Sequence, residues 1–161
     1  MYRRAFVIGL GTVAALPGWF ALRAGATDKE TRLDRIQRSE AEWRRRLTEK
    51  EFNILREAGT ESPHSSPLAK EKREGTYVCA GCGLALFRSE WKYESGTGWP
   101  SFYDVMADHI ETQRDWALVI PRTEYHCARC GGHQGHVFDD GPEPTGKRYC
   151  NNGLALDFEL A

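Results

Sequence analysis

Four of the five cysteines occur in two copies of one short pattern. Each copy is C-x-x-C followed by a glycine, which lets the chain turn without a Cβ clash. Two such turns can complete a tetrahedral four-cysteine site with Zn–S distances of about 2.3 Å and no open ligand position. The spacing therefore predicts one structural zinc ion per chain, with Cys79, Cys82, Cys127 and Cys130 as its ligands. Two disulfides, or one redox-active C-x-x-C, are the alternatives.

The fifth cysteine, Cys150, has no such partner. Arg148 lies two residues before it, and alternate residues of a strand face the same side. We expect the guanidinium to lower the pKa of the thiol and favour the thiolate. His133, His136 and Asp140 lie upstream, so the set predicts nucleophilic sulfur chemistry with proton transfer. Inert burial of the thiol is the alternative. Three further histidines receive no role: His64, His109 and His126.

A glycine-rich loop over 95–102 carries two aromatic residues, Trp99 and Phe102. The face of such a ring suits a methyl or thioether group, through sulfur–aromatic contacts worth about 0.3–1.5 kcal/mol. Both rings are candidate substrate-binding residues. Core packing is the alternative, and for Phe102 it is the better fit.

Short elements must position these residues. Ser39 with Glu42, and Thr48 with Glu51, have the spacing of capping boxes and predict two helix starts, and Gly59 is the expected C-terminal glycine. After Gly75 the pattern becomes short alternating or apolar runs between Gly, Pro and Asp. The runs predict strands at 76–78, 84–87, 116–120, 137–138 and 155–160. The expected fold is mainly β, a single domain with a short helical N-terminal flap.

The first 26 residues have the layout of a secretory signal peptide. Arg3 and Arg4 precede an uncharged stretch over 5–22, and Ala24-Gly25-Ala26 forms an A-x-A cleavage site. Arg3-Arg4-Ala5-Phe6-Val7 is similar to the twin-arginine export signal, whose route carries folded proteins. We therefore expect a bacterial protein of the periplasm or cell envelope. An uncleaved membrane anchor is the alternative.

The expected organisation is a signal peptide over 1–26, a linker over 27–38 and a functional domain over 39–161. Cleavage removes three arginines and no acidic residue, so the net charge moves from −1 to −4. This balance argues against a nucleic-acid binder that works through a basic face. The whole chain has 161 residues, of which 40% are hydrophobic, enough for a packed core and against global disorder.

Four motifs together resemble the B-type methionine sulfoxide reductases. They are the paired C-x-x-C knuckles, the loop Gly98-Trp99-Pro100-Ser101-Phe102, the run His133-x-Gly-His136-Val-Phe-x-Asp140-Gly-Pro, and Arg148-Tyr149-Cys150-x-Asn152. The resemblance covers about residues 39–161. It implies a β domain of two antiparallel sheets that reduces methionine-R-sulfoxide, mainly in oxidised proteins, and so repairs them.

The resemblance also implies roles by position. Cys150 is the nucleophile that attacks the sulfoxide sulfur, and it becomes a sulfenic acid as methionine leaves. His133 and His136 bind the substrate and supply or position the proton for its oxygen. Three residues orient and electrostatically tune the site: Asn152, Asp140 and Arg148. The indole of Trp99 forms the wall of the pocket for the methionine methyl group.

One departure from the family pattern concerns the second thiol. Many members have a resolving cysteine where this chain has Thr97, and the other four cysteines are assigned to zinc. We therefore expect an external thiol, from a thioredoxin-like protein or a small reductant, to attack Cys150 after each turnover. A second departure is Asn151-Asn152-Gly153, where the family more often has an apolar residue followed by Asn-Ser.

A non-enzymatic alternative remains open. A zinc-stapled β module that binds a peptide or protein partner through the aromatic loop would explain the knuckles, Trp99 and the strands. It would leave Cys150, Arg148 and the paired histidines without a role. Membrane attachment is expected only if the N-terminal segment stays uncleaved.

Overall fold

A computed structural model of the chain describes residues 33–116 and 121–161. The signal segment lies outside the described residues, and so does most of the strand expected at 116–120. Trp116 itself follows the end of a strand and is not part of one. Among the described residues, no helix combines the length and the apolar character that crossing a membrane requires.

Two short helices open the described chain, α1 (Glu40–Arg46) and α2 (Glu49–Glu57). Both predicted capping boxes are present: the Ser39 side chain accepts from the Glu42 N–H, and the Thr48 side chain accepts from the Glu51 N–H. In each box the glutamate reaches back to the backbone of the capping residue. These bonds confirm the two predicted helix starts. They could be predicted because the two residues of each capping box lie only three positions apart in the sequence.

The end of α2 differs from the prediction. Ala58, not Gly59, adopts the left-handed conformation, with φ 52° and ψ 36°. The Gly59 N–H donates to the Asn53 carbonyl oxygen at 3.0 Å, and a Cβ at Gly59 would lie 2.0 Å from Asn53 Oδ1. A Cβ there would make the exposed Asn53 side chain move, and the backbone angle of Gly59 does not require glycine.

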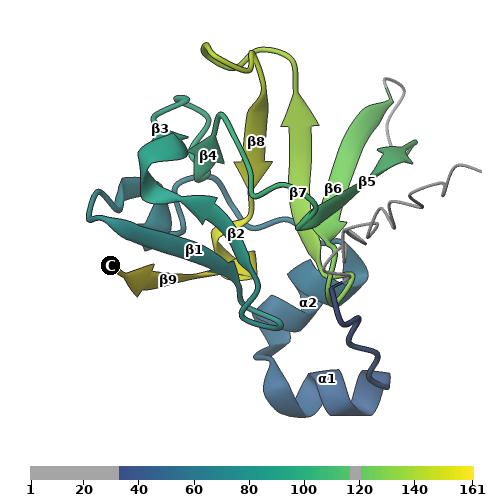
Figure 1. Cartoon of the computed structure of the whole chain (residues 1–161). Helices are drawn as coiled ribbons and strands as arrows, with labels where there is room; N and C mark the ends of the chain where they lie inside the picture. Colours follow the sequence, from purple (N-terminus) through teal and green to yellow (C-terminus); the bar gives the residue numbers. More distant parts are fainter. Residues whose placement is uncertain (1–32, 117–120) are drawn as a thin grey trace, which may run out of the picture. The chain divides into compact units, whose positions relative to one another are not determined.

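The strands form two antiparallel sheets, which confirms the predicted fold class (Figure 1). The smaller sheet has the order β2-β1-β9 and the larger the order β3-β4-β8-β7-β6-β5. The smaller sheet comprises β1 (Gly75–Cys79), β2 (Ala85–Arg88) and β9 (Leu156–Leu160). The larger comprises β3 (Lys92–Tyr93), β4 (Ser101–Phe102), β5 (Ile110–Asp115), β6 (Arg122–Cys127), β7 (His133–Phe138) and β8 (Arg148–Asn151). Three 3₁₀ turns complete the elements: η1 (Pro67–Lys70), η2 (Ser89–Trp91) and η3 (Gly153–Ala155).

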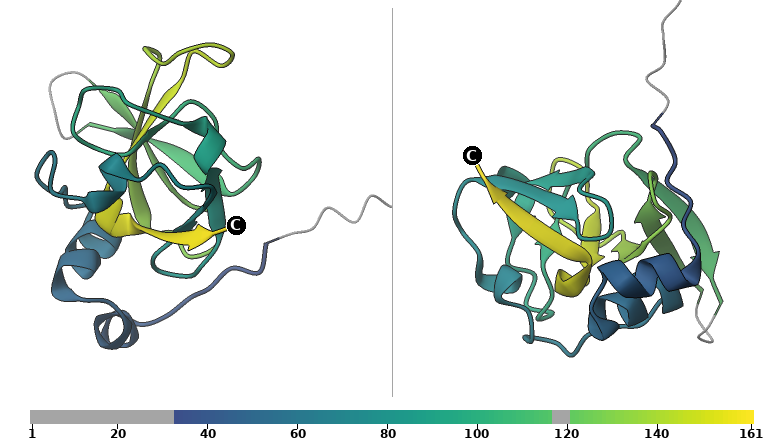
Figure 2. Two further views of the ribbon diagram at one scale, coloured as in Figure 1. Left: turned by 90° about the vertical axis from the view of Figure 1, so that its left-hand side faces the viewer. Right: turned by 90° about the horizontal axis from the view of Figure 1, so that it is seen from below.

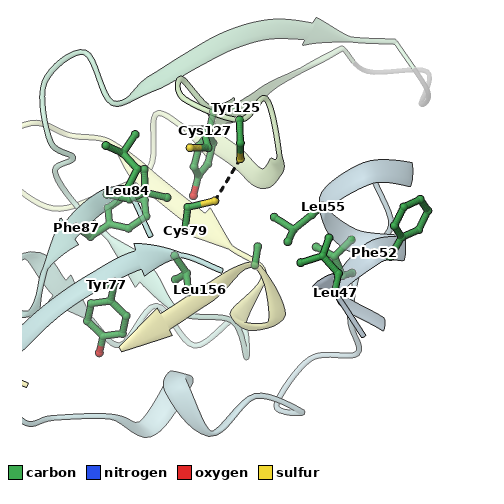
Figure 3. Close-up of a cluster of buried hydrophobic side chains, with 14 of the residues drawn as sticks. Leu47, Phe52, Leu55, Tyr77, Cys79, Leu84, Phe87, Tyr125, Cys127 and Leu156 are labelled. Atoms are coloured by element: carbon green, nitrogen blue, oxygen red, sulfur yellow. Dashed lines mark hydrogen bonds between the residues drawn. The ribbon is translucent and has the colours of Figure 1, made fainter. Parts of the chain in front are cut away.

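The core joins the two sheets through aromatic rings. Phe87 stacks on Phe102 with centroids 4.1 Å apart, and Tyr77 meets Phe102 edge-on at 4.9 Å. All three rings are fully buried. The helices add Leu55 and its neighbours to this cluster, in which Cys79 and Cys127 also lie (Figure 3).

The helices close one end of the larger sheet. Helix α2 contacts β7 and the η3 turn, and the chain between Glu61 and Pro67 then leads to the smaller sheet (Figure 2). The strands β4, β8 and β7 are neighbours, so Ser101, Cys150 and His136 lie side by side across the larger sheet. This register brings three separate sequence motifs to one place.

Candidate active site and metal centre

Each cysteine pair sits in a tight turn at the end of a strand. The Gly83 N–H donates to the Cys79 carbonyl oxygen at 2.7 Å, and the Gly131 N–H donates to that of Cys127 at 2.8 Å. The two glycines have φ values of 71° and 66°, which L-residues with a Cβ rarely adopt. The glycine in each C-x-x-C-G motif therefore makes the turn possible, as the sequence predicts.

The two turns bring four sulfurs together. Cys79 Sγ lies 3.6 Å from Cys130 Sγ, and Cys82 Sγ lies 3.5 Å from Cys127 Sγ. Four thiolates about 2.3 Å from a tetrahedral zinc would lie about 3.8 Å from one another. All five cysteines lie in the described part of the chain, and none forms a disulfide. The donor set and its spacing therefore fit a closed four-cysteine metal site.

A pocket of about 170 Å³ opens beside the fifth cysteine. Five of the residues singled out in the sequence line it: Trp99, His136, Arg148, Cys150 and Asn152. The rest of the lining comes from Thr60, Thr97, Arg122, Gly135, Phe138 and Asn151. Arg148 and Cys150 reach the same pocket because they are alternate residues of β8.

The charge state of Cys150 differs from the expectation. Burial raises the pKa of its thiol above the ordinary value, and the Arg148 charge and a hydrogen bond from Thr97 offset only part of that rise. Arg148 does lower the pKa of the thiol, as expected. Burial raises the pKa by more, because a thiolate is less stable away from water. The sequence could not reveal this because it does not show burial.

Arg148 is fixed on two sides. Its Nε and Nη2 donate to the two oxygens of Asp140, each at 2.8 Å. Its guanidinium lies 4.2 Å from the centroid of the Phe138 ring. Asp140 does not line the pocket; it holds Arg148 in place, and its own negative charge adds a small rise to the pKa of Cys150. The bidentate pair also lowers the pKa of Asp140.

His136 lies on β7 opposite Cys150 of β8. Its Nε2 is 2.8 Å from Asp115 Oδ2, and Arg122 Nη2 donates to the same oxygen at 2.6 Å. Sequence reasoning missed Asp115 and Arg122 because neither residue belongs to a recognised motif. Only the antiparallel pairing of these strands brings Arg122 to the pocket lining and Asp115 to the His136 side chain.

His133 lies behind the pocket lining and is almost completely buried. Its Nδ1 contacts Glu124 Oε1, and its Nε2 has no hydrogen-bond partner among the residues that the structure describes. Burial lowers the pKa of the imidazole, and the Glu124 carboxylate opposes that shift. The sequence did not single out Glu124, which lies on the neighbouring strand β6.

The segment around Glu61 holds Trp99 and Asn152 in place. The Trp99 indole Nε1–H donates to the Glu61 carbonyl oxygen at 3.1 Å, and the Glu61 N–H donates to Asn152 Oδ1 at 3.2 Å. Asn152 Nδ2 also donates to the Gln134 carbonyl oxygen at 3.2 Å. The pocket wall is therefore tied to the chain that leads from the helices.

Two loop residues behave differently from the sequence-based interpretation. Phe102 is fully buried in the core against Phe87 and Tyr77, and it does not line the pocket. Its assignment as a substrate-binding residue is therefore corrected. Thr97, noted only for a missing cysteine, lines the pocket together with Cys150.

The chain resembles known proteins over most of its length. The SelR domain family model matches residues 47–160. "Peptide methionine sulfoxide reductase MsrB" of Methanosarcina barkeri is 50% identical over 125 residues, which are 77% of this chain and 88% of that protein. The protein of the same name from Leptospira interrogans is 49% identical, over 77% of this chain and 95% of its own length. The protein of this name from Leifsonia xyli is 52% identical, over 77% of this chain and 91% of its own length.

Proposed function

The chain belongs to the SelR domain family, that of the B-type methionine sulfoxide reductases, and we propose that Cys150 carries out its reaction. The activity is the reduction of methionine-R-sulfoxide in proteins, which repairs oxidised methionine. One observation carries the proposal for the site: the Cys150 thiol lies in a pocket with a guanidinium, an imidazole and an indole. The pure binding module is not favoured, since it gives this arrangement no role.

The reaction begins with a protonated thiol. Because burial raises the pKa of Cys150, its proton resides on Sγ before substrate binds. We propose that this proton passes through His136, the neighbour of Cys150 across the strand pair, to the sulfoxide oxygen. Asp115 stabilises the protonated imidazole during the transfer.

Attack then proceeds at the sulfoxide sulfur. Sγ forms a bond to that sulfur as its oxygen gains a proton, and transfer of the hydroxyl leaves methionine and a Cys150 sulfenic acid. One thiol and one sulfoxide thus give one sulfenic acid and one thioether, so atoms and electrons balance. The Arg148 guanidinium stabilises the thiolate as it forms, and Asp140 and Phe138 hold Arg148 in position.

The pocket wall selects the substrate. Trp99 and Phe138 offer ring faces to the methyl group of the sulfoxide. Asn152 uses one N–H of its side-chain amide on Gln134, and the other can donate to the sulfoxide oxygen. With Sγ approaching the sulfur from the Cys150 side, a methyl on the aromatic side and an oxygen on the polar side fix one epimer.

An external thiol completes the cycle. It condenses with the Cys150 sulfenic acid to give a mixed disulfide and water, and a second thiol releases Cys150 and forms the external disulfide. Thr97 supports this proposal, because a hydroxyl stands in the pocket where a resolving thiol would be needed. The reductant class is a thioredoxin-like protein or a small thiol.

The four-cysteine cluster is proposed to hold one structural zinc ion. Cys79 belongs to the smaller sheet and Cys127 to the larger, so a metal bound there cross-links the two. The ion, when bound, supplies stability alone, because four thiolates leave no position for substrate.

We further propose that the protein is exported to the bacterial periplasm or cell envelope and repairs proteins there. The support is the signal-like segment with Arg3-Arg4-Ala5-Phe6-Val7. Replacing both arginines by lysine should retain the full-length precursor in the cytoplasm. Processed protein in the periplasm of that variant would contradict the twin-arginine route.

A single-turnover experiment tests the catalytic residue. The wild-type chain, given substrate without reductant, should form one methionine per chain and a sulfenic acid on Cys150 that a dione reagent traps. Cys150→Ser should form neither while it retains its bound zinc. Methionine formation by that variant would overturn the assignment.

A further inference from the structure

A second cluster of metal-ligating side chains lies on β6 and β7, separate from the four cysteines. Glu124 and His126 are alternate residues of β6 and share one face. His133 begins β7 and is paired across the strands with His126. The motifs gave no reason to join these three residues, and His126 had received no role at all.

The donor atoms of the cluster converge. Glu124 Oε1 lies 2.9 Å from His126 Nε2 and also contacts His133 Nδ1. One donor atom from each residue lies within 4.8 Å of those of the other two. Donors about 2.1 Å from a tetrahedral zinc are about 3.4 Å apart. Shifts of about an ångström or less in three side chains would therefore admit the ion.

The chemistry of the donors matches such an ion. Two imidazoles and one carboxylate form the ligand set of open-coordination zinc sites. Gln113 Nε2 donates to the other carboxylate oxygen, Glu124 Oε2, at 2.9 Å, which is the kind of outer-shell contact that orients a ligand. The His133 and Glu124 side chains are 3% and 10% exposed, and that of His126 is 19% exposed. His126 thus marks the side from which an ion would enter.

We propose that Glu124, His126 and His133 form a second, exchangeable site for Zn²⁺. Its ligands are nitrogen and oxygen atoms, so it binds more weakly than the four-thiolate site and fills after it. A hydrogen-bonded network without metal affinity is the competing explanation of the same contacts.

The effect of this second zinc ion on activity rests on the proposed function. That function passes the proton through His136, and the His133 ring lies 5.7 Å from the His136 ring. A zinc ion on His133 Nδ1 would replace the proton there and fix the ring. Occupation of the second site should therefore inhibit the reductase reversibly.

Zinc stoichiometry tests the site itself. The measurement uses the full chain with Cys150→Ser, which removes the only thiol outside the four-cysteine cluster, and equilibrium dialysis against Zn²⁺. We expect two zinc ions per chain, and one when His126→Ala is added. His64→Ala, a change at an exposed histidine outside the cluster, should still bind two. One ion per chain in the Cys150→Ser protein, or two after His126→Ala is added, would overturn the proposal.

The retained first zinc shows that each variant has folded, so loss of the second cannot be ascribed to unfolding. His126→Asn serves as a second variant and should also bind one ion. With Co²⁺ in the second site, the added absorption should lack thiolate charge-transfer bands. Such bands would place the ion on sulfur and contradict the site.

Inhibition is measured separately, as methionine formed in a single turnover by chains with an intact Cys150. Each protein is compared with its own rate at one zinc per chain. The wild-type rate should fall at least tenfold when the second ion binds, whereas the His126→Ala rate should stay within twofold. Two bound ions with an unchanged wild-type rate would leave the site standing but contradict the proposed inhibition.

Discussion

At the scale of single residues, the reactivity of Cys150 depends on two opposing effects. Burial disfavours its thiolate, and the Arg148 guanidinium and the Thr97 hydroxyl favour it. Burial prevails, so the resting thiol keeps its proton. That proton is the one that the sulfoxide oxygen needs, and this couples deprotonation of the nucleophile to activation of the substrate.

The charge of Arg148 should be visible in the pH dependence of the rate. Because the guanidinium lowers the pKa of Cys150, Arg148→Met should raise that pKa further. The thiol then keeps the proton that the reaction needs up to a higher pH, so the alkaline fall of kcat/KM should move to higher pH. The measurement is the pH profile of kcat/KM for both proteins.

Lys147→Met is the matched control for Arg148→Met. Lys147 is exposed and pairs with Asp139, away from the pocket lining. The pH profile of kcat/KM for Lys147→Met should coincide with that of the wild type. A profile of Arg148→Met that moves to lower pH would contradict the proposed role of the guanidinium.

Thr97 offers a second prediction at this scale. It lines the same pocket as Cys150, and its hydroxyl hydrogen-bonds Ser95 Oγ at 2.8 Å, so a thiol at this position would lie near the nucleophile. Thr97→Cys should therefore form an intramolecular disulfide with Cys150 after one turnover without reductant. Mass spectrometry of the digested protein detects the linked peptides.

The wild type and Thr97→Ser should form no such link, because neither places a thiol there. An intramolecular disulfide that involves Cys150 in the wild type would contradict the one-cysteine cycle. It would also show that a cysteine of the metal cluster can leave its partners.

At the scale of elements, the spacing of β7 and β8 creates the site. Gly135 of β7 faces the backbone of Cys150, and a Cβ at Gly135 would lie 2.0 Å from the Cys150 carbonyl oxygen. No side chain can relieve this overlap, because both partners are backbone of paired strands. The strand that carries His136 therefore approaches the strand that carries Cys150 only with glycine at this position.

Gly135→Ala should push the two strands apart. We expect it to destabilise the fold by about 3 kcal/mol and to abolish most activity even where the protein remains folded. Urea unfolding and steady-state kinetics measure the two effects. A stable and fully active Gly135→Ala protein would contradict the dependence of the site on strand spacing.

Gly146→Ala is the comparison within the same hairpin. Gly146 has φ 68° but open space around its Cβ position, so only backbone strain of about 1–2 kcal/mol is expected. Its activity in the folded state should match that of the wild type.

Some of these elements could be predicted from the sequence, and the reason is local. The capping boxes of α1 and α2 and the glycines of both knuckles need only neighbouring residues. The apolar runs at β1 and β9 also stand out. By contrast, β5 reads IETQRD and β6 reads RTEYHC, so polar residues hide the strand pattern.

The site residues also divide into those that the sequence could predict and those that it could not. The motifs identified Cys150, Arg148 and His136, because each belongs to a recognisable run. Glu124 and Asp115 could not be found, since their partners lie nine and 21 residues away on neighbouring strands. The prediction for the Cys150 pKa also failed in net direction, because burial is a property of the folded chain.

At the scale of the whole molecule, the four-cysteine cluster joins the two sheets. Cys79 ends β1 and Cys127 ends β6, and the core rings lie between the same sheets. Removal of zinc should therefore destabilise the entire domain and not one loop. Calorimetry after chelation should show Tm lower by roughly 10 °C or more, with activity lost in parallel.

Cys82→Ser should reproduce the effect of chelation without a chelator. Added zinc should restore Tm in the chelated wild type but not in this variant. An unchanged Tm after complete zinc removal would contradict the structural role of the metal.

The central claim is that Cys150 reduces one epimer of methionine sulfoxide within the pocket bounded by Trp99 and Phe138. The most direct measurement is the rate of methionine formation from separate R and S epimers in a peptide, with wild type and Cys150→Ser. The wild type should reduce the R epimer and leave the S epimer unchanged, and Cys150→Ser should reduce neither. Reduction of the S epimer alone, or of the R epimer by Cys150→Ser, would contradict the claim.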